Sequence, residues 1–172
     1  MIVSKRAEVQ ELIHTVKLNI EKSKDAVEEV IRKKNSLDAL KTLKFDKCAY
    51  DPLDGEPKNF IEVINQAYSD LVVLYAVDKL LEKYPDKQFE LHMGALNGPD
   101  IESVDGTVIA ECFATVTAFN NRKIQKDCEK LKGFDSTIDR YIFFYSREDT
   151  EEKIESYAQK NREITFIRIK DF

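Results

Sequence analysis

The Asp-Gly pair at residues 105–106 constrains the fold of this chain more strongly than any other local feature. Asp-Gly between two apolar segments is a strong signal for a β-hairpin with a tight turn, because glycine readily adopts the positive φ angle that such a turn requires. The flanking segments 100–104 and 107–116 are therefore expected to form antiparallel strands. Pairing outward from this turn places Asp100 opposite Glu111.

The expected pairing sets two carboxylates side by side, since residues directly opposite each other have Cβ atoms roughly 4.5–5.5 Å apart. The alternation of strand side chains puts four residues on one face: Asp100, Glu102, Glu111 and Phe113. Like charges at this spacing repel, and a divalent cation bound by carboxylate oxygens would compensate for the repulsion. Two other interpretations stay open: one acid lies beyond the sheet edge in solvent, or one acid pairs with a lysine.

Hydrophobic periodicity and turn signals divide the rest of the second half into helices and strands. Helices are expected at 59–83, 121–132 and 149–160, and strands at 88–94, 140–146 and 163–170. Asn120 or Asn121 would cap the start of the second of these helices, and Gly133 would cap its end. The resulting order predicts an α/β fold with a mixed central sheet flanked by helices.

The first half of the chain is expected to be helical, with one long helix at 5–34 and a short one at 36–44. Apolar residues follow an alternating spacing of four and three that is close to a heptad seam: Val9, Ile13, Val16, Ile20, Val27, Val30 and Leu37. The long helix either packs on its own domain, as part of a helical hairpin, or serves as an arm that forms a homodimer. The turn-rich segment 46–58 is expected to link this arm, residues 1–45, to an α/β domain at 59–172.

Composition narrows the class of protein. The net charge of −5 argues against non-specific coating of nucleic acid, although residues 1–50 hold 11 Lys and Arg against 8 Asp and Glu. The sequence has no run of about 18 apolar residues and begins without the apolar core of a signal peptide, so we expect no membrane span and a cytoplasmic location. Its three cysteines are far apart, which favours reduced thiols.

Two short motifs resemble the signature of the PD-(D/E)xK nuclease superfamily. Gly98-Pro99-Asp100 and Glu111-Cys112-Phe113 are similar to the two halves of that signature, and the expected order of elements is similar to the superfamily core. The resemblance covers roughly residues 59–172. It implies a restriction-endonuclease-like mixed central sheet, with the long N-terminal helix as an addition outside the core.

The resemblance also implies a chemistry. Asp100 and Glu111 would bind Mg²⁺ or Mn²⁺, and the backbone carbonyl of Cys112 would add a further ligand. The metal would activate water to cleave a phosphodiester of DNA or RNA, with DNA as the favoured partner. Glu62 and Gln66 on the first helix of the domain, together with Glu102, would supplement the site. Glu62 and Gln66 could equally form an exposed helix surface.

One departure from the signature is serious, because Phe113 stands where the catalytic lysine belongs. In a first explanation the cation has moved to the next helix, where Lys123 is the preferred substitute. The neighbouring Asn121, Arg122 and Lys126 would then contact phosphates, or would simply form a solvated helix face. In a second explanation the domain is catalytically inactive and binds nucleic acid or a protein partner.

Overall fold

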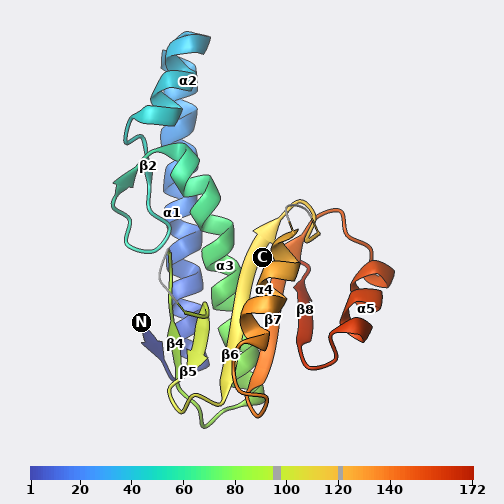
Figure 1. Ribbon diagram of the computed structural model, residues 1–172. Helices are drawn as coiled ribbons and strands as arrows, with labels where there is room; N and C mark the ends of the chain where they lie inside the picture. Colours follow the sequence, from blue (N-terminus) through green and yellow to red (C-terminus); the bar gives the residue numbers. More distant parts are fainter. Residues whose placement is uncertain (95–97, 120–121) are drawn as a thin grey trace. The chain divides into compact units, whose positions relative to one another are not determined.

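The computed structural model describes residues 1–94, 98–119 and 122–172. Over these residues the chain is an α/β protein with five helices, a mixed six-stranded sheet and a small two-stranded sheet (Figure 1). It divides into two compact units. Unit 1 consists of Met1–Val9 and Val72–Phe172, and unit 2 of Gln10–Leu71.

The helices lie close to their expected positions. They are α1 (Arg6–Lys33), α2 (Ser36–Phe45), α3 (Phe60–Lys83), α4 (Lys123–Lys132) and α5 (Glu151–Lys160). The strands are β1 (Ile2–Val3), β2 (Ala49–Tyr50), β3 (Pro57–Lys58), β4 (Phe89–Leu91), β5 (Ile101–Ser103), β6 (Val108–Thr115), β7 (Asp139–Ser146) and β8 (Thr165–Ile169). The sequence patterns did not indicate β1, β2 or β3, each of which has only two residues.

The six-stranded sheet belongs to unit 1 and has the order β1-β4-β5-β6-β7-β8. Neighbouring strands from β1 to β6 are antiparallel, whereas β6, β7 and β8 run parallel. Parallel neighbours need a crossover connection, and α4 and α5 supply the two crossovers. The prediction of a mixed sheet flanked by helices is therefore confirmed.

The hairpin between β5 and β6 has the predicted register. Ile101 pairs with Ala110 and Glu102 pairs with Ile109, and one further step brings Asp100 opposite Glu111. The Gly106 φ angle is 70°, a left-handed value that favours glycine. The connection spans residues 104–107 and is closed by a 2.8 Å hydrogen bond from the Gly106 N–H to the Ser103 carbonyl, so it is longer than the expected two-residue turn. The register is nonetheless the predicted one, and it aligns the two acids.

One face of the sheet carries a hydrophobic core shared with α4 and α5. Its buried residues are Ile109, Phe113, Ala118, Ile124, Cys128, Leu131, Ile142, Phe144, Ile154 and Ile164. The part of α3 that belongs to unit 1 lies on the other side of the sheet from α4 (Figure 1). Lys83, at the end of α3, donates a 2.5 Å hydrogen bond to the Tyr141 hydroxyl of β7. Strand β6 is buried on both faces and can hold a polar side chain away from bulk water.

Helix α4 begins at Lys123, with Arg122 in the N-cap position at a left-handed φ of 57°. The expected caps, Asn120 and Asn121, lie outside the described residues. Gly133 is the C-cap as predicted, and its N–H donates to the carbonyl oxygens of Leu131 and Lys130. The helix therefore starts with two basic side chains.

In unit 2, residues of the apolar seam of α1 are buried. Ile13, Val16 and Val27 are buried, which agrees with packing of α1 against α3, the core helix. The segment 46–58, expected to be a linker, forms the β2–β3 hairpin. Ser23 of α1 binds the Tyr50 backbone in both directions, donating at 3.2 Å and accepting at 2.9 Å, so this hairpin is attached to the helix.

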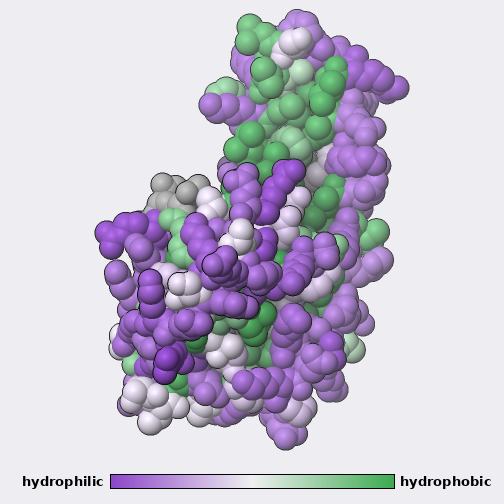
Figure 2. All heavy atoms as spheres, turned by 90° about the vertical axis from the view of Figure 1, so that its right-hand side faces the viewer, coloured by the Kyte–Doolittle hydropathy of each residue, from purple (hydrophilic) through white to green (hydrophobic). Residues whose placement is uncertain are grey.

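Apolar side chains also lie on the surface of the unit 2 helices (Figure 2). The exposed ones are Leu18, Ile31, Leu37, Leu40, Phe45, Ile61, Ile64 and Tyr68. Because Ile13, Val16 and Val27 are buried, a homodimer formed through α1 would have to use exposed residues such as Leu18 and Ile31 instead.

Helix α3 is long and apolar enough to span a membrane by length and composition alone. Half of its apolar window is buried inside the protein, and the core helix of a soluble protein passes the same test.

Candidate functional site

Asp100 directly precedes β5, and its side chain is tied to β6. Its Oδ2 accepts a 2.7 Å hydrogen bond from the backbone N–H of Cys112, the residue after Glu111. Burial raises the pKa of the Asp100 carboxyl, and the hydrogen bond from Cys112 opposes that rise. The predicted neighbourhood of Asp100 and Glu111 is thus present in the structure.

Glu111 lies in the middle of β6, and its side chain is only 3% exposed. Burial raises its pKa to about 7, and the negative charges of Asp100 and Asp127 add to the rise. The Lys130 ammonium lies 2.6 Å from Glu111 Oε1 and opposes the rise. Oε1 has no well-aligned hydrogen-bond partner among the described residues, so the contact is an ion pair. The interpretation in which one acid pairs with a lysine therefore holds for Glu111.

Helix α4 contributes a third buried acid. Asp127 occupies the buried face of α4 together with Ile124, Cys128 and Leu131. Its Oδ1 accepts a 2.8 Å hydrogen bond from the Lys123 ammonium, whereas its buried Oδ2 has no hydrogen-bond partner among the described residues. Burial raises the pKa of the Asp127 carboxyl. A carboxylate at a helix position that normally holds an apolar residue costs stability, which makes it a candidate for a functional role.

Two lysines of α4 reach the acids from the same helix. The Lys123 ammonium lies 5.4 Å from the centre of the Phe113 ring, and its charge opposes the rise in the pKa of Asp100 that burial causes. The Lys130 ammonium contacts Glu111 and also donates a 2.5 Å hydrogen bond to the Gly98 carbonyl. Lysine side chains with 43% and 41% exposure combine a partly buried stem with an ammonium that can reach solvent.

Cys112 has a buried thiol, and burial raises its pKa well above the usual value, so the thiol is no candidate nucleophile. Its backbone is of more interest. The N–H and C=O of a strand residue face the same neighbouring strand, and the Cys112 N–H faces Asp100. The ladder between β5 and β6 ends here, because the Cys112 N–H binds the Asp100 side chain and the Pro99 carbonyl contacts His92 Nδ1 at 2.7 Å instead. If a cation binds beside Asp100, the Cys112 carbonyl is the backbone ligand that the resemblance implies.

The other basic residues predicted at the start of α4 lie on its outer surface. Arg122 is exposed and donates a 2.8 Å hydrogen bond to Gln125, with Glu129 at 3.8 Å. Lys126 is exposed as well. Asn121, which was expected to contact phosphate with them, lies outside the described residues.

The three residues that were expected to supplement the site do not all belong to the same unit. Glu102 lies on β5 in unit 1, half-buried, and pairs with Glu90 and Ile109. Glu62 and Gln66 lie on the part of α3 that belongs to unit 2, whereas Asp100 and Glu111 belong to unit 1. Gln66 accepts a 3.1 Å hydrogen bond from Lys58, and Glu62 is exposed.

The chemistry of these groups fits a hard divalent cation. Carboxylate and carbonyl oxygens are the ligands that Mg²⁺ and Mn²⁺ prefer. Asp127 Oδ2 is buried without a hydrogen-bond partner among the described residues, whereas Glu111 Oε1 is occupied by the Lys130 ammonium. Within the described ranges, no three His, Cys, Asp or Glu side chains form a ready metal-binding group. A cation would therefore be held by Asp100 and Glu111, with the Cys112 carbonyl or water completing the ligands.

The sequence patterns singled out neither Asp127 nor Lys130 as a site residue. A signal for Asp127 was present, because it follows Ile124 by three residues and precedes Leu131 by four, the spacing of a buried stripe. Lys130 carried no such signal, since its ion pair with Glu111 depends on how α4 packs on β6.

Fold and site together define an α/β protein in which a cluster of acids and lysines joins β5, β6 and α4. No protein-family model, curated protein or solved structure matches the chain. Any assignment of function therefore depends on the geometry of this cluster.

Proposed function

We propose that unit 1 is a restriction-endonuclease-like nuclease domain that hydrolyses phosphodiester bonds of nucleic acid, preferably DNA, with Mg²⁺ or Mn²⁺. The observation that carries the proposal is the β5–β6 register, which aligns Asp100 with Glu111 at a buried position. The order of elements from α3 to β8 supports it, because it is similar to the order in the nuclease core.

Asp100 and Glu111 are the residues that would hold the cation, together with the Cys112 carbonyl. When bound, such a cation lowers the pKa of water and stabilises negative charge on the phosphate. It would also neutralise the mutual repulsion of Asp100, Glu111 and Asp127, which burial makes strong. Lys130 would then leave Glu111 for solvent, which its partly exposed side chain permits.

Lys123 takes the role of the missing signature lysine in this proposal. Its ammonium stands over Phe113, the position of that lysine, and is held there by Asp127. From this place it would orient the attacking water or stabilise the charge that develops on the phosphate. Phe113 itself fills the core, where its ring stacks on Phe144 with centroids 5.5 Å apart.

The alternative is an inactive nuclease-fold module that binds nucleic acid or a protein partner. The Lys130–Glu111 ion pair favours it, because an ammonium that neutralises Glu111 permanently would substitute for the metal. The net charge of −5 also favours the inactive module, and it favours a protein partner of that module over nucleic acid.

A nicking assay tests the proposal directly. Supercoiled plasmid and labelled DNA and RNA strands are incubated with the wild-type protein in Mg²⁺, Mn²⁺ or EDTA. We expect metal-dependent nicking by the wild type that Glu111→Gln abolishes. The matched control is Glu90→Gln, which changes an exposed acid on β4 of the same sheet and should nick like the wild type. Strand binding without nicking in any metal would favour the inactive module.

A further inference from the structure

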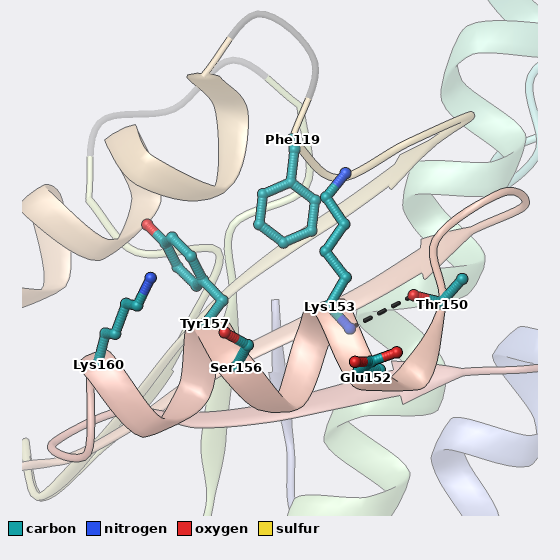
Figure 3. A pocket seen from close by; sticks show the side chains of 7 residues that line it. All are labelled: Phe119, Thr150, Glu152, Lys153, Ser156, Tyr157 and Lys160. Atoms are coloured by element: carbon teal, nitrogen blue, oxygen red, sulfur yellow. Dashed lines mark hydrogen bonds between the residues drawn. The ribbon is translucent and has the colours of Figure 1, made fainter.

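A pocket of about 400 Å³ lies beside α5, entirely within unit 1 and apart from the acidic cluster (Figure 3). It is lined by Phe119, Thr150, Glu152, Lys153, Ser156, Tyr157 and Lys160. All but Phe119 come from α5 and its N-cap, while Phe119 comes from the segment that joins β6 to α4. The pocket therefore adjoins the connection between the strand of Glu111 and the helix of Lys123.

The aromatic rings of this pocket are held in place by their contacts with one another and with the core. Phe119 and Tyr157 meet edge to face with centroids 5.4 Å apart, and Tyr157 makes a similar contact with Phe166 at 5.7 Å. Both rings are half-buried and pack against the core under α4 and α5. Rings held in this way offer a fixed platform to a flat ligand.

The other side of the pocket carries two lysines. Lys153, Tyr157 and Lys160 follow the spacing of one helix face. In Figure 3 the Lys153 side chain reaches Phe119, whereas Lys160 lies on the far side of Tyr157. The Lys153 ammonium lies 4.1 Å from the centre of the Phe119 ring and 3.6 Å from the buried Asp149 Oδ1. Lys160 is exposed. Two ammonium groups and an aromatic platform thus share one hollow.

We propose that this pocket binds one nucleotide of a single strand, with the base on Phe119, its phosphate at Lys153, and Lys160 adding positive charge from beyond Tyr157. The inference rests on the proposed function and names an unpaired nucleotide as part of the substrate. Stacking of bases on aromatic side chains beside basic groups is the general mode of single-strand binding, and it tolerates any base.

The arrangement favours a nucleotide over a bare anion. Glu152 lines the same pocket and Asp149 lies behind Lys153, so the local charge is balanced and phosphate alone gains little. A base on Phe119 would replace the Lys153 ammonium there, and stacking on this half-buried ring is the stronger contact of the two. The displaced ammonium would then pair with the phosphate.

Binding of thymidine monophosphate and of a short single-stranded oligonucleotide, both without metal, tests the proposal. Equilibrium dialysis measures the nucleotide, and fluorescence anisotropy measures the strand. We expect Phe119→Leu and Lys160→Gln each to raise Kd about tenfold, and Glu152→Gln to lower it. Lys170→Gln, an exposed lysine outside the pocket, should leave Kd unchanged.

Two further results separate this proposal from the nuclease proposal. Asp100→Ala should retain nucleotide binding, because Asp100 does not line the pocket. A wild-type protein that binds the nucleotide through Phe119 but never nicks would support the pocket and overturn only the nuclease proposal. Equal Kd values for the wild type, Phe119→Leu and Lys160→Gln would overturn the pocket. Binding of inorganic phosphate as tight as that of the nucleotide would also overturn it.

Discussion

The Lys123 ammonium of α4 lies 5.4 Å from the centre of the Phe113 ring of β6. Phe113 occupies the strand position at which the nuclease signature has a lysine, and the contact brings the ammonium of a helix lysine close to that position. Phe113 itself stacks on Phe144 in the core. The arrangement divides two tasks between two residues, since the strand supplies packing and the helix supplies charge. It is the basis for treating Lys123 as the functional cation.

Lys123→Ala is expected to reduce metal-dependent nicking by about 10²–10³-fold, the usual cost of removing one group that stabilises charge in the transition state. Affinity for Mn²⁺ should change little, because Lys123 is not a proposed ligand. The comparison is Lys126→Ala, which removes an exposed lysine from the same helix. Equal losses in the two variants would show that α4 contributes only a general positive surface.

Asp127→Asn is expected to stabilise the metal-free protein and to lower its activity. Burial raises the pKa of Asp127, so above that pKa the ionised form destabilises the fold, and a neutral amide of the same shape relieves this cost. We expect Tm to rise by about 2–4 °C at pH 8. Thermal unfolding and nicking, measured on the same samples, check both halves. A fall in Tm with unchanged nicking would mark Asp127 as purely structural.

Asp70, which lies in unit 2 and outside the candidate site, should make the stability of the fold depend on pH. Burial, with a smaller effect of Asp51, raises its pKa from 3.8 to about 7. The folded protein therefore holds a proton between roughly pH 4 and pH 7 that the unfolded chain has released, and stability falls as the pH rises through this window. The shift corresponds to at most about 4 kcal/mol.

Asp70→Asn should flatten this decline, with its largest stabilisation relative to wild type at pH 8. Urea unfolding at intervals between pH 4 and pH 8 measures the difference. Asp25→Asn, an exposed acid on α1 in the same unit, should follow the wild-type curve. A curve for Asp70→Asn parallel to that of the wild type would contradict the assigned pKa.

The alignment of Asp100 and Glu111 could be predicted because it depends on local chemistry. The Asp-Gly turn fixes the register, and a register fixes which side chains face each other. The long helices and most strands were predictable for a similar reason, since each repeats an apolar pattern over several turns or residues.

Features that depend on contacts between distant segments were not predictable. Strand β1 exists because Ile2 and Val3 pair with β4, almost ninety residues away, and two residues are too few for a periodic pattern. The β2–β3 hairpin lies within the segment expected to be a linker, and its two-residue strands are likewise too short for a periodic pattern. Lys130 looked like a surface residue until the packing of α4 placed it against Glu111.

Calorimetric titration of Mn²⁺ into the metal-free protein tests the central claim, that Asp100 and Glu111 bind a divalent cation. The wild type and the Glu90→Gln control should bind with the same affinity. Asp100→Ala should weaken binding by about 100-fold or more, because even groups that only support metal ligands contribute 10–100-fold. A wild-type protein that gives no binding heat, or an Asp100→Ala variant that binds like the wild type, would contradict the claim.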